Sequence, residues 1–439
     1  MLAKDILALP GEQLPDEVEA AGWVHRIREF GGMAFIILRD RSALIQLIFS
    51  KELLEELSPT LESVIQIRGK PVLNDKAPGG LELEVFAATM QSRAATDLPY
   101  QVNADPSRFS LDAILANRVL SLRNPKIRAI FQVQATILEA YAAYLRSEGF
   151  TEIKTSKLVG ASNEGGTELF SVDYFDRKVY LAQSPQTYKQ TMIASGLERV
   201  FEVAPAYRAE KHDTPRHLNE YISLDVEMAF IESEIELINL EKRVLSHIFA
   251  EVARNNAEEL ALWNATVPER EAVMAAPIVP YDEALEIANQ EAAKAGSARL
   301  FDINPEAERI LCAWADAAHG IPLIFVNQFP RRHRPFYTYP LGASQEEAAL
   351  TMSFDALFRG LEITTGGRRQ HDYNALLEAL PRFGIKSESM TSYLTVFKYG
   401  CPPHGGFAIG CERLTQKILG LANIKEASLF PRDRKRVEP

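Results

Sequence analysis

The first 95 residues contain five strand-like runs, and this pattern narrows the possible folds more than any other feature of the chain. The runs are VEAAGWVHRIRE, MAFIILRD, SALIQLIFS, SVIQIRGKPVLN and LELEVFAATM. Turn signals separate them, and the helix-like KELLEEL stands between the third run and the fourth. Five strands with a helix after the third are typical of an OB-fold barrel, although other small barrels also have five strands. We predict such a barrel over residues 1–95.

The remainder of the chain mixes helices with strands. Residues 96–125 lose the alternation and are rich in Pro, Asp and Ser, which is typical of a linker. From residue 126 the apolar spacing becomes helical, and the Glu- and Ala-rich stretch around 255–320 is predicted to be a helical insert. We therefore predict an α+β protein with a linker at 96–125 and a larger domain at 126–439.

Composition restricts the cellular context. The formal net charge is −11 and the pI is about 5.4, which argues against a wholly basic nucleic-acid coat but permits a local basic groove. The three cysteines have no CxxC spacing, so neither a zinc site nor a disulfide framework is expected. We find no signal-peptide pattern and no apolar run of membrane-spanning length. We expect a cytoplasmic protein with no membrane partner.

Residues 200–230 are predicted to form a charged hairpin. Neither GxxxxGK[ST] nor GxGxxG after a strand occurs, so any phosphate site must be built differently. The first strand ends at Arg208 and Glu210, and the second carries Tyr221, Asp225 and Glu227 between apolar residues. An arginine at a strand end can bind a phosphate bidentately. The alternative is a solvated hairpin with surface ion pairs.

Three further stretches carry chemistry. In FDALFRGLEITTGGRRQHDY, Asp355 and Glu362 could hold Mg²⁺ on nucleotide phosphates, or could be unrelated surface acids. Ser184 and Pro185 predict a helix start that puts Lys189 in the first turns, where it either has a function or faces solvent. In PHGGFAIGCERL, a strand-like run leads directly into the charged pair Glu412-Arg413.

Together these stretches resemble the motifs of class II aminoacyl-tRNA synthetases. Residues 207–227 resemble motif 2, Gly410 to Arg413 resembles motif 3, and GFTEIKTSKL resembles motif 1 with Ser156 in place of the usual proline. The resemblance covers nearly the whole chain and is strongest to the archaeal-type aspartyl branch. It implies an antiparallel sheet flanked by helices in the catalytic domain and an OB-fold domain that binds the anticodon.

The resemblance also implies the nucleotide site. ATP is the expected substrate, with Arg208 and Arg413 as the catalytic residues on its phosphates. Mg²⁺ is expected on Asp355, Glu362 and Thr365. The expected ATP-binding residues are Arg208, Glu210, Arg216, His217, Leu218, Tyr221, Glu362, Gly410, Cys411, Glu412 and Arg413.

The amino acid implied by the resemblance is aspartate. Lys189 and Arg369 match the family's carboxylate binders, and two cations would not suit a neutral asparagine amide. Glu168 and Asp225 match groups near the ammonium. The full expected set is Glu168, Gln186, Thr187, Tyr188, Lys189, Arg208, Asp225, Thr365 and Arg369.

The barrel is expected to read the anticodon. The candidate residues are His25, Arg26, Arg28, Phe35, Gln46 and Pro78. Phe35 could instead be barrel core. His25 and Pro78 resemble the subgroup that charges both tRNA(Asp) and tRNA(Asn), or they are neutral loop substitutions. Charging of both would make a tRNA-dependent amidotransferase a partner. A homodimer is expected from motif 1.

Other functions stay open from sequence alone. These are an aspartyl enzyme strict for tRNA(Asp), an asparaginyl or lysyl-like ligase, an asparagine synthetase, and a catalytically dead RNA binder. The presence of Arg208, Asp355, Glu362 and Arg413 disfavours the dead paralogue, and the OB-fold disfavours the asparagine synthetase.

Overall fold

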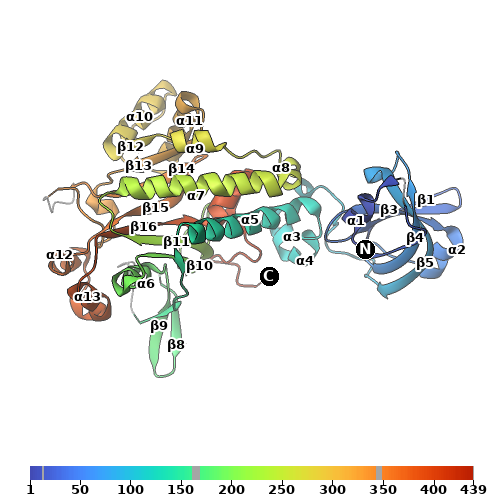
Figure 1. Cartoon of the computed structure of the whole chain (residues 1–439), viewed down its shortest axis with the longest axis horizontal. Helices are drawn as coiled ribbons and strands as arrows, with labels where there is room; N and C mark the ends of the chain where they lie inside the picture. Colours follow the sequence, from blue (N-terminus) through green and yellow to red (C-terminus); the bar gives the residue numbers. More distant parts are fainter. Residues whose placement is uncertain (12–13, 161–168, 343–348, 439) are drawn as a thin grey trace. The chain divides into compact units, whose positions relative to one another are not determined.

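The computed structural model describes residues 1–11, 14–160, 169–342 and 349–438 (Figure 1). The chain divides into two compact units, Met1–Asn124 and Pro125–Pro439. The stretch predicted as a linker contains the helices α3 (Leu111–Ala116) and α4 (Arg118–Ser121), and up to Asn124 it packs with the first unit.

The first unit is a closed five-stranded barrel with the strand order β1-β2-β3-β5-β4. Alternate residues such as Ala34, Ile36 and Leu38 fill its core, as the period of two predicts. Its elements are α1 (Ala3–Leu7), β1 (Val18–Phe30), β2 (Met33–Arg39), β3 (Leu44–Ser50), α2 (Lys51–Leu57), β4 (Val64–Leu73) and β5 (Leu81–Ser92). The five strands and the helix after the third agree with the sequence prediction, and the OB-fold is confirmed.

The second unit is built on an eight-stranded sheet with the order β12-β13-β14-β15-β16-β11-β10-β6. The strands are β6 (Thr151–Glu152), β10 (Arg199–Tyr207), β11 (Glu220–Ala229), β12 (Ile278–Pro280), β13 (Leu323–Asn327), β14 (Ser353–Phe358), β15 (Leu361–Arg369) and β16 (His404–Gly410). The six central strands are antiparallel as predicted. The two edge strands pair in parallel because each returns to the sheet after a long connection.

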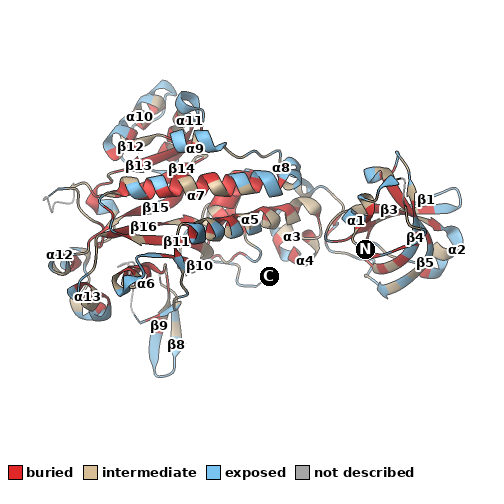
Figure 2. Cartoon of the chain, viewed as in Figure 1, coloured by how far each residue is buried: buried red, intermediate tan, exposed pale blue. Residues whose placement is uncertain are grey.

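Three helices cover one face of this sheet, and the polar side chains of the central strands lie on the other. α5 (Pro125–Ser147), α7 (Glu234–Asn255) and α14 (Cys411–Leu419) pack on the apolar side chains of the central strands, including Leu224 and Val226 (Figures 1 and 2). The period of two along β11 therefore turns Tyr221, Ser223 and Asp225 to the opposite face. The predicted charged hairpin consists of β10 and β11. Its polar side chains lie on a face of the large central sheet and not on a solvated hairpin surface.

The stretch around 255–320 is largely helical, but it also supplies a strand. It contains α8 (Ala257–Leu262), α9 (Arg270–Ala275), the strand β12, α10 (Tyr281–Lys294) and α11 (Pro305–His319), and α10 and α11 share a core with β13. A small sheet of β7 (Leu158–Val159), β8 (Ser171–Tyr174) and β9 (Arg177–Leu181) stands apart. The remaining helices are α6 (Gln186–Met192), α12 (Tyr373–Ala379) and α13 (Thr391–Lys398).

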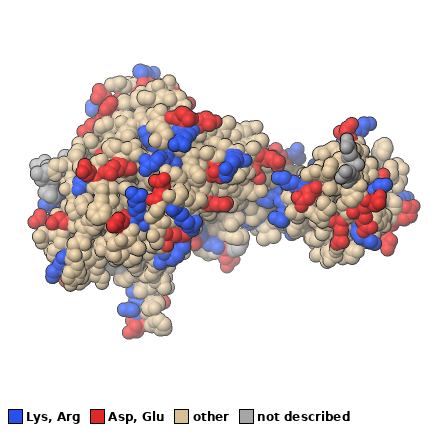
Figure 3. Space-filling view, viewed as in Figure 1, with Lys and Arg blue, Asp and Glu red and all other residues tan. Residues whose placement is uncertain are grey.

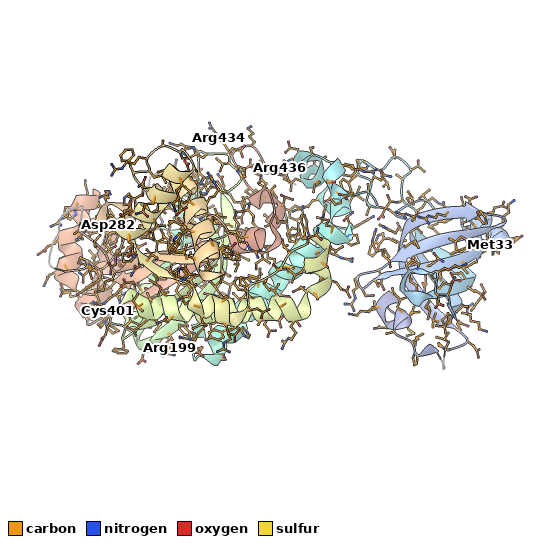
Figure 4. The ribbon with its side chains drawn as sticks, turned by 90° about the horizontal axis from the view of Figure 1, so that it is seen from above. Met33, Arg199, Asp282, Cys401, Arg434 and Arg436 are labelled. Carbon is orange, nitrogen blue, oxygen red and sulfur yellow. The ribbon has the colours of Figure 1, made fainter. Side chains whose placement is uncertain are left out.

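Both signs of charge occur on the face of the molecule drawn in Figure 3. Lys and Arg alternate with Asp and Glu over the face drawn in Figure 3. Figure 4 labels Asp282 at the start of α10 and Met33 at the start of β2, where half of the Met33 side chain is exposed. Within the described residues, no helix is long and apolar enough to cross a bilayer. Cys312, Cys401 and Cys411 are all unpaired.

Candidate active site

The face of the large sheet opposite α5, α7 and α14 carries an open cleft, in which the space between the atoms, open solvent included, is about 690 Å³. Its walls come from the end of β10, the loop 208–219, β11, β15 and the junction of β16 with α14. All the residues predicted to bind ATP line this cleft except Cys411. The lining is Arg208, Glu210, Arg216, His217, Leu218, Tyr221, Ser223, Glu362, Ile363, Thr365, Ala408, Gly410, Glu412, Arg413 and Ile424.

Cys411 and Glu412 have structural contacts at the strand-to-helix junction. The Cys411 side chain is fully buried in the core beneath the sheet, and burial raises the pKa of its thiol well above the usual value. Cys411 is the first residue of α14 and belongs to the apolar face of that helix, so its side chain points toward the core. The Glu412 carboxylate accepts a hydrogen bond from the Ile222 backbone N–H at 3.0 Å, and burial raises its pKa to about 7. This contact fastens α14 to β11.

Three arginines lie along the cleft. The Arg413 guanidinium donates to the Glu362 carbonyl at 2.9 Å and to its carboxylate at 3.1 Å. The Arg208 guanidinium lies 5.5 Å from the centroid of the Tyr221 ring. These positions explain why a charged pair follows the strand-like run. The strand β16 ends beside the cleft, and the start of the next helix therefore places Arg413 in it. Such cations suit a polyphosphate.

The third arginine is held by the insert. Arg216 donates to both carboxylate oxygens of Glu308, at 2.8 and 2.9 Å, and Glu308 is only 4% exposed. The same carboxylate accepts from the Glu362 backbone N–H at 3.0 Å. Glu308 lies on α11, so the insert orients two cleft residues. Nothing in the sequence pattern distinguished this glutamate from its surface neighbours on the helix.

Asp355, Glu362 and Thr365 meet at one place, as a cation site requires. Asp355 pairs with Thr365 across β14 and β15, and a bulge at Ile363 puts Glu362 and Thr365 on the same face. Burial, together with the neighbouring Glu362 and against the influence of Arg334, raises the Asp355 pKa to about 6. Two repelling carboxylates and a hydroxyl are oxygen ligands that fit Mg²⁺. The reading of these acids as unrelated surface residues is wrong.

Arg334 is a neighbour that the sequence analysis missed. Its guanidinium lies 2.8 Å from the Asp355 carboxylate, donates to the Ser353 hydroxyl and covers the Phe329 ring. It and Arg413 together offset the charge of the two acids. Its loop, 328–340, carries several arginines, and sequence alone could not separate this one from the others.

A buried ion cluster lies farther along β11. The Lys189 ammonium is 3.0 Å from the Asp225 carboxylate and 3.2 Å from that of Glu227, and Arg369 donates to Glu227 at 3.0 Å. Lys189 is 2% exposed, so it does not face solvent. Burial alone would raise the Glu227 pKa, but Arg369 and Lys189 hold it below its usual value. The cluster contains two cations and two anions.

Two glutamines lie on the same face of α6 as Lys189. The Nε2 amides of Gln186 and Gln190 are buried and lack hydrogen-bond partners among the described residues. Arg369 uses Nε and one terminal nitrogen on Glu227 and on the Gly406 carbonyl, and its Nη1 has no partner in the described part of the chain. Buried donors without a protein partner are uncommon, and those beside this cluster are free to bond a water or a ligand.

The other residues predicted for the amino acid are placed less centrally. Helical spacing on α6 puts Gln186, Lys189 and Gln190 on one face, and Thr187 and Tyr188 on other faces. Glu168 lies outside the described residues. Glu227 was missed as a site residue, although its spacing of two from Asp225 on a strand indicated a shared face. Arg208 and Thr365 line the adjacent cleft.

The barrel carries a separate hollow that gathers all six predicted anticodon residues. It is lined by His25, Arg26, Arg28, Phe35, Ile37, Leu44, Gln46, Lys76 and Pro78. Phe35 is half-buried on the outer face of β2 and does not belong to the barrel core. An aromatic ring beside arginines and an amide can stack and hydrogen-bond an unpaired base.

The fold and the cleft define a class II aminoacyl-tRNA synthetase: an antiparallel sheet with arginines and paired acids on its open face, preceded by an OB-fold. The family described as "tRNA synthetases class II (D, K and N)" matches residues 110–434. A second family, described as "OB-fold nucleic acid binding domain", matches residues 18–91. The chain therefore belongs to the class II tRNA synthetases of the D, K and N group.

Full-length relatives narrow the comparison. The chain is 45% identical over 439 residues to aspartate--tRNA(Asp/Asn) ligase of Thermus thermophilus, covering 100% of both chains. It is 40% identical over 431 residues to aspartate--tRNA(Asp) ligase of Pyrococcus horikoshii, covering 96% of each. Asparaginyl-tRNA synthetase from Pyrococcus horikoshii, solved with asparaginyl-adenylate, superposes with a TM-score of 0.90 at 27% identity, covering 100% of this chain and 99% of that one.

The Glu308 contact gives a first prediction. We expect Glu308→Gln to lower kcat/KM for ATP by about tenfold, because it weakens charge-assisted hydrogen bonds to Arg216 and changes the acceptor at the Glu362 backbone. ATP–pyrophosphate exchange measures this. Glu306→Gln, two residues earlier on α11, is the matched control and should leave the exchange rate unchanged. Equal losses in both variants would contradict a specific role for Glu308.

Proposed function

We propose that this chain attaches L-aspartate to tRNA(Asp) and also to tRNA(Asn), using ATP. The observation that carries the choice of amino acid is the buried cluster of Lys189 and Arg369 with Asp225 and Glu227. The free Nη1 of Arg369 offers two N–H groups to a ligand carboxylate. The names of the relatives from Thermus thermophilus and Pyrococcus horikoshii support the same amino acid.

Discrimination against asparagine follows from the charges. An amide offers one oxygen acceptor and an NH₂ group, and the NH₂ would face the Arg369 donors. A buried cation left without an acceptor loses much of its hydration, so a site built for a carboxylate rejects the amide strongly. The structural likeness to an asparaginyl enzyme rests on the shared fold and does not reproduce this choice.

The reaction uses positioning and charge rather than a protein nucleophile. The α-carboxylate of aspartate attacks the α-phosphorus of ATP, an aspartyl-adenylate forms, and pyrophosphate leaves. The terminal ribose hydroxyl of the tRNA then attacks the aspartyl carbonyl and AMP leaves. Arg208 would stabilise the charge developing on the α-phosphate, and Arg413 the far phosphates, while Tyr221 stacks on adenine. Bound Mg²⁺ on Asp355, Glu362 and Thr365 would supply further neutralisation of the phosphates.

The partners are part of the proposal. We assign the barrel hollow to the anticodon, with His25 and Pro78 as the positions that admit both tRNAs. Proline has no N–H to donate, so Pro78 removes one base-specific contact at the rim. The enzyme acts as a cytoplasmic homodimer through motif 1, and a tRNA-dependent amidotransferase uses its Asp-tRNA(Asn).

Aminoacylation with labelled aspartate and labelled asparagine, each on tRNA(Asp) and tRNA(Asn) transcripts, tests the proposal. We expect aspartate on both tRNAs and no asparagine on either. Aspartate on tRNA(Asp) alone would remove the relaxed specificity and keep the enzyme. Asparagine transfer would refute the reading of the Lys189–Arg369 cluster, and no transfer at all would favour a dead RNA binder.

A further inference from the structure

A buried network surrounds His25, inside the barrel unit and beside the anticodon hollow. The His25 Nδ1 lies 2.8 Å from Nη1 of Arg39, and Arg39 donates twice to Glu62, at 2.9 and 2.6 Å. Arg123 adds a second contact to Glu62 at 3.1 Å. Arg39 and Glu62 are 1% and 4% exposed, so this is a buried structure rather than a surface ion pair.

The backbone is shaped to bring this network together. The register of β1 with β2 skips a residue between Val24 and Arg26, so His25 is the extra residue of a β-bulge. A bulge redirects a side chain that regular alternation would place elsewhere. Glu62 has a φ of +66°, a conformation that residues other than glycine rarely adopt. Arg39 contacts the residues at both of these local departures from regular structure, His25 and Glu62, which favours a functional reason.

The chemistry of Arg39 fixes the state of the ring. A guanidinium only donates hydrogen bonds, so the His25 Nδ1 must accept, and the ring proton must be on Nε2. Burial, with the positive charge of Arg39 and against the influence of Glu62, lowers the His25 pKa to about 4. The ring is therefore neutral near pH 7. Its Nε2–H has no hydrogen-bond partner among the described residues, and His25 lines the hollow with Phe35 and Gln46.

We propose that Arg39, held by Glu62, is a positioning residue that fixes His25 as an Nε2–H donor to O2 of the third anticodon base. This proposal rests on the proposed function and deepens it. Cytosine and uracil differ at N3 and at the exocyclic group on C4, but both present O2 as an acceptor. A single donor placed at O2 holds either base equally. The network thus provides binding without discrimination at the position where the two tRNAs differ.

The experiment replaces O2 by sulfur, a poorer acceptor. The tRNA(Asp) is made with 2-thiocytosine and the tRNA(Asn) with 2-thiouracil at the third anticodon position, and each is compared with its unmodified form. We expect the wild-type enzyme to lose about tenfold in kcat/KM for aspartylation of each thio-substituted tRNA. In Arg39→Met the two unmodified tRNAs should fall by similar factors, and the thio-substitution should have almost no further effect.

Two variants separate positioning from folding. Arg39→Lys keeps a donor for Nδ1 and should retain the thio effect. Arg68→Met removes an exposed ion pair with Glu17 on the same barrel and should behave as wild type. Should Arg39→Met fail to fold, ¹⁵N-histidine spectra of the wild-type enzyme still report the tautomer of His25, assigned by its absence in His25→Gln.

The outcomes are distinct. A thio effect in wild type that disappears in Arg39→Met, with an Nε2–H tautomer, supports the proposal. An Nδ1–H tautomer, no thio effect in wild type, or a thio effect unchanged in Arg39→Met would overturn it. If the wild type charges only tRNA(Asp) but keeps its thio effect there, the relaxed specificity fails while the role of Arg39 stands.

Discussion

An Arg369→Gln enzyme is expected to lose about 10²- to 10³-fold in kcat/KM for aspartate, mainly through a higher KM. Arg369 is 6% exposed and bonds both Glu227 and the Gly406 carbonyl. Its removal takes away the donors assigned to the substrate carboxylate and leaves Glu227 with Lys189 as its remaining close cation. Steady-state aminoacylation at varied aspartate concentration measures the effect.

The neighbouring arginine is the matched control. Arg368 belongs to the same strand but donates to the Glu232 carbonyl at 3.1 Å and lies over the Tyr339 ring at 4.0 Å. Arg368→Gln should change kcat/KM for aspartate by less than about threefold. If both variants lose activity equally, the loss reflects damage to β15 rather than to substrate recognition, and the assignment of Arg369 fails.

The same variant tests discrimination between the two amino acids. The ratio of kcat/KM for aspartate over asparagine should fall by at least about tenfold, because Arg369→Gln removes a cation that pairs with both oxygens of a carboxylate but with only one atom of an amide. Asparagine should still be a poor substrate, since the buried Lys189 ammonium remains. A variant that loses aspartate activity without any change in this ratio would place Arg369 in structure alone.

The sequence contained most of the cleft because its residues lie in short, ordered stretches. Arg208 and Glu210 follow one strand, Tyr221 and Asp225 lie on the next, and Arg413 follows a third, so local pattern was enough to identify them. The five strands of the barrel could be predicted equally well from the alternation of apolar and polar residues and from the turn residues between them. In both cases the informative contacts are close in sequence.

The contacts that the sequence did not reveal join distant segments. Glu308 reaches Arg216 from 92 residues away, and Arg334 approaches Asp355 from a separate loop. No periodicity marks such residues, because their neighbours on the helix or loop have the same composition. The bulge that aligns Glu362 with Thr365 is likewise a property of strand pairing. For Cys411 the sequence pattern predicted too much. The residue is adjacent to Glu412 and Arg413 in sequence, but its side chain is buried and does not line the cleft.

Gly406→Ala is expected to reduce both stability and activity. An added Cβ would lie under 3.0 Å from the Val226 carbonyl oxygen and from the Glu227 carboxylate, closer than such atoms approach in proteins. The strand β16 passes so near β11 at this point that only glycine fits. Either β16 shifts or Glu227 leaves its contacts with Lys189 and Arg369. We expect a loss of about 1–3 kcal/mol in the free energy of unfolding.

A second glycine of the same strand provides the comparison. A Cβ on Gly410 would meet the Arg413 side chain at 3.6 Å, an ordinary contact, so Gly410→Ala should unfold like the wild type. In Gly406→Ala, KM for aspartate should rise at least tenfold even at temperatures where the variant is fully folded, because the displaced Glu227 no longer orients the two cations. Denaturant unfolding followed by aminoacylation separates the two effects. A folded Gly406→Ala enzyme with unchanged KM would show that Glu227 does not position the aspartate site.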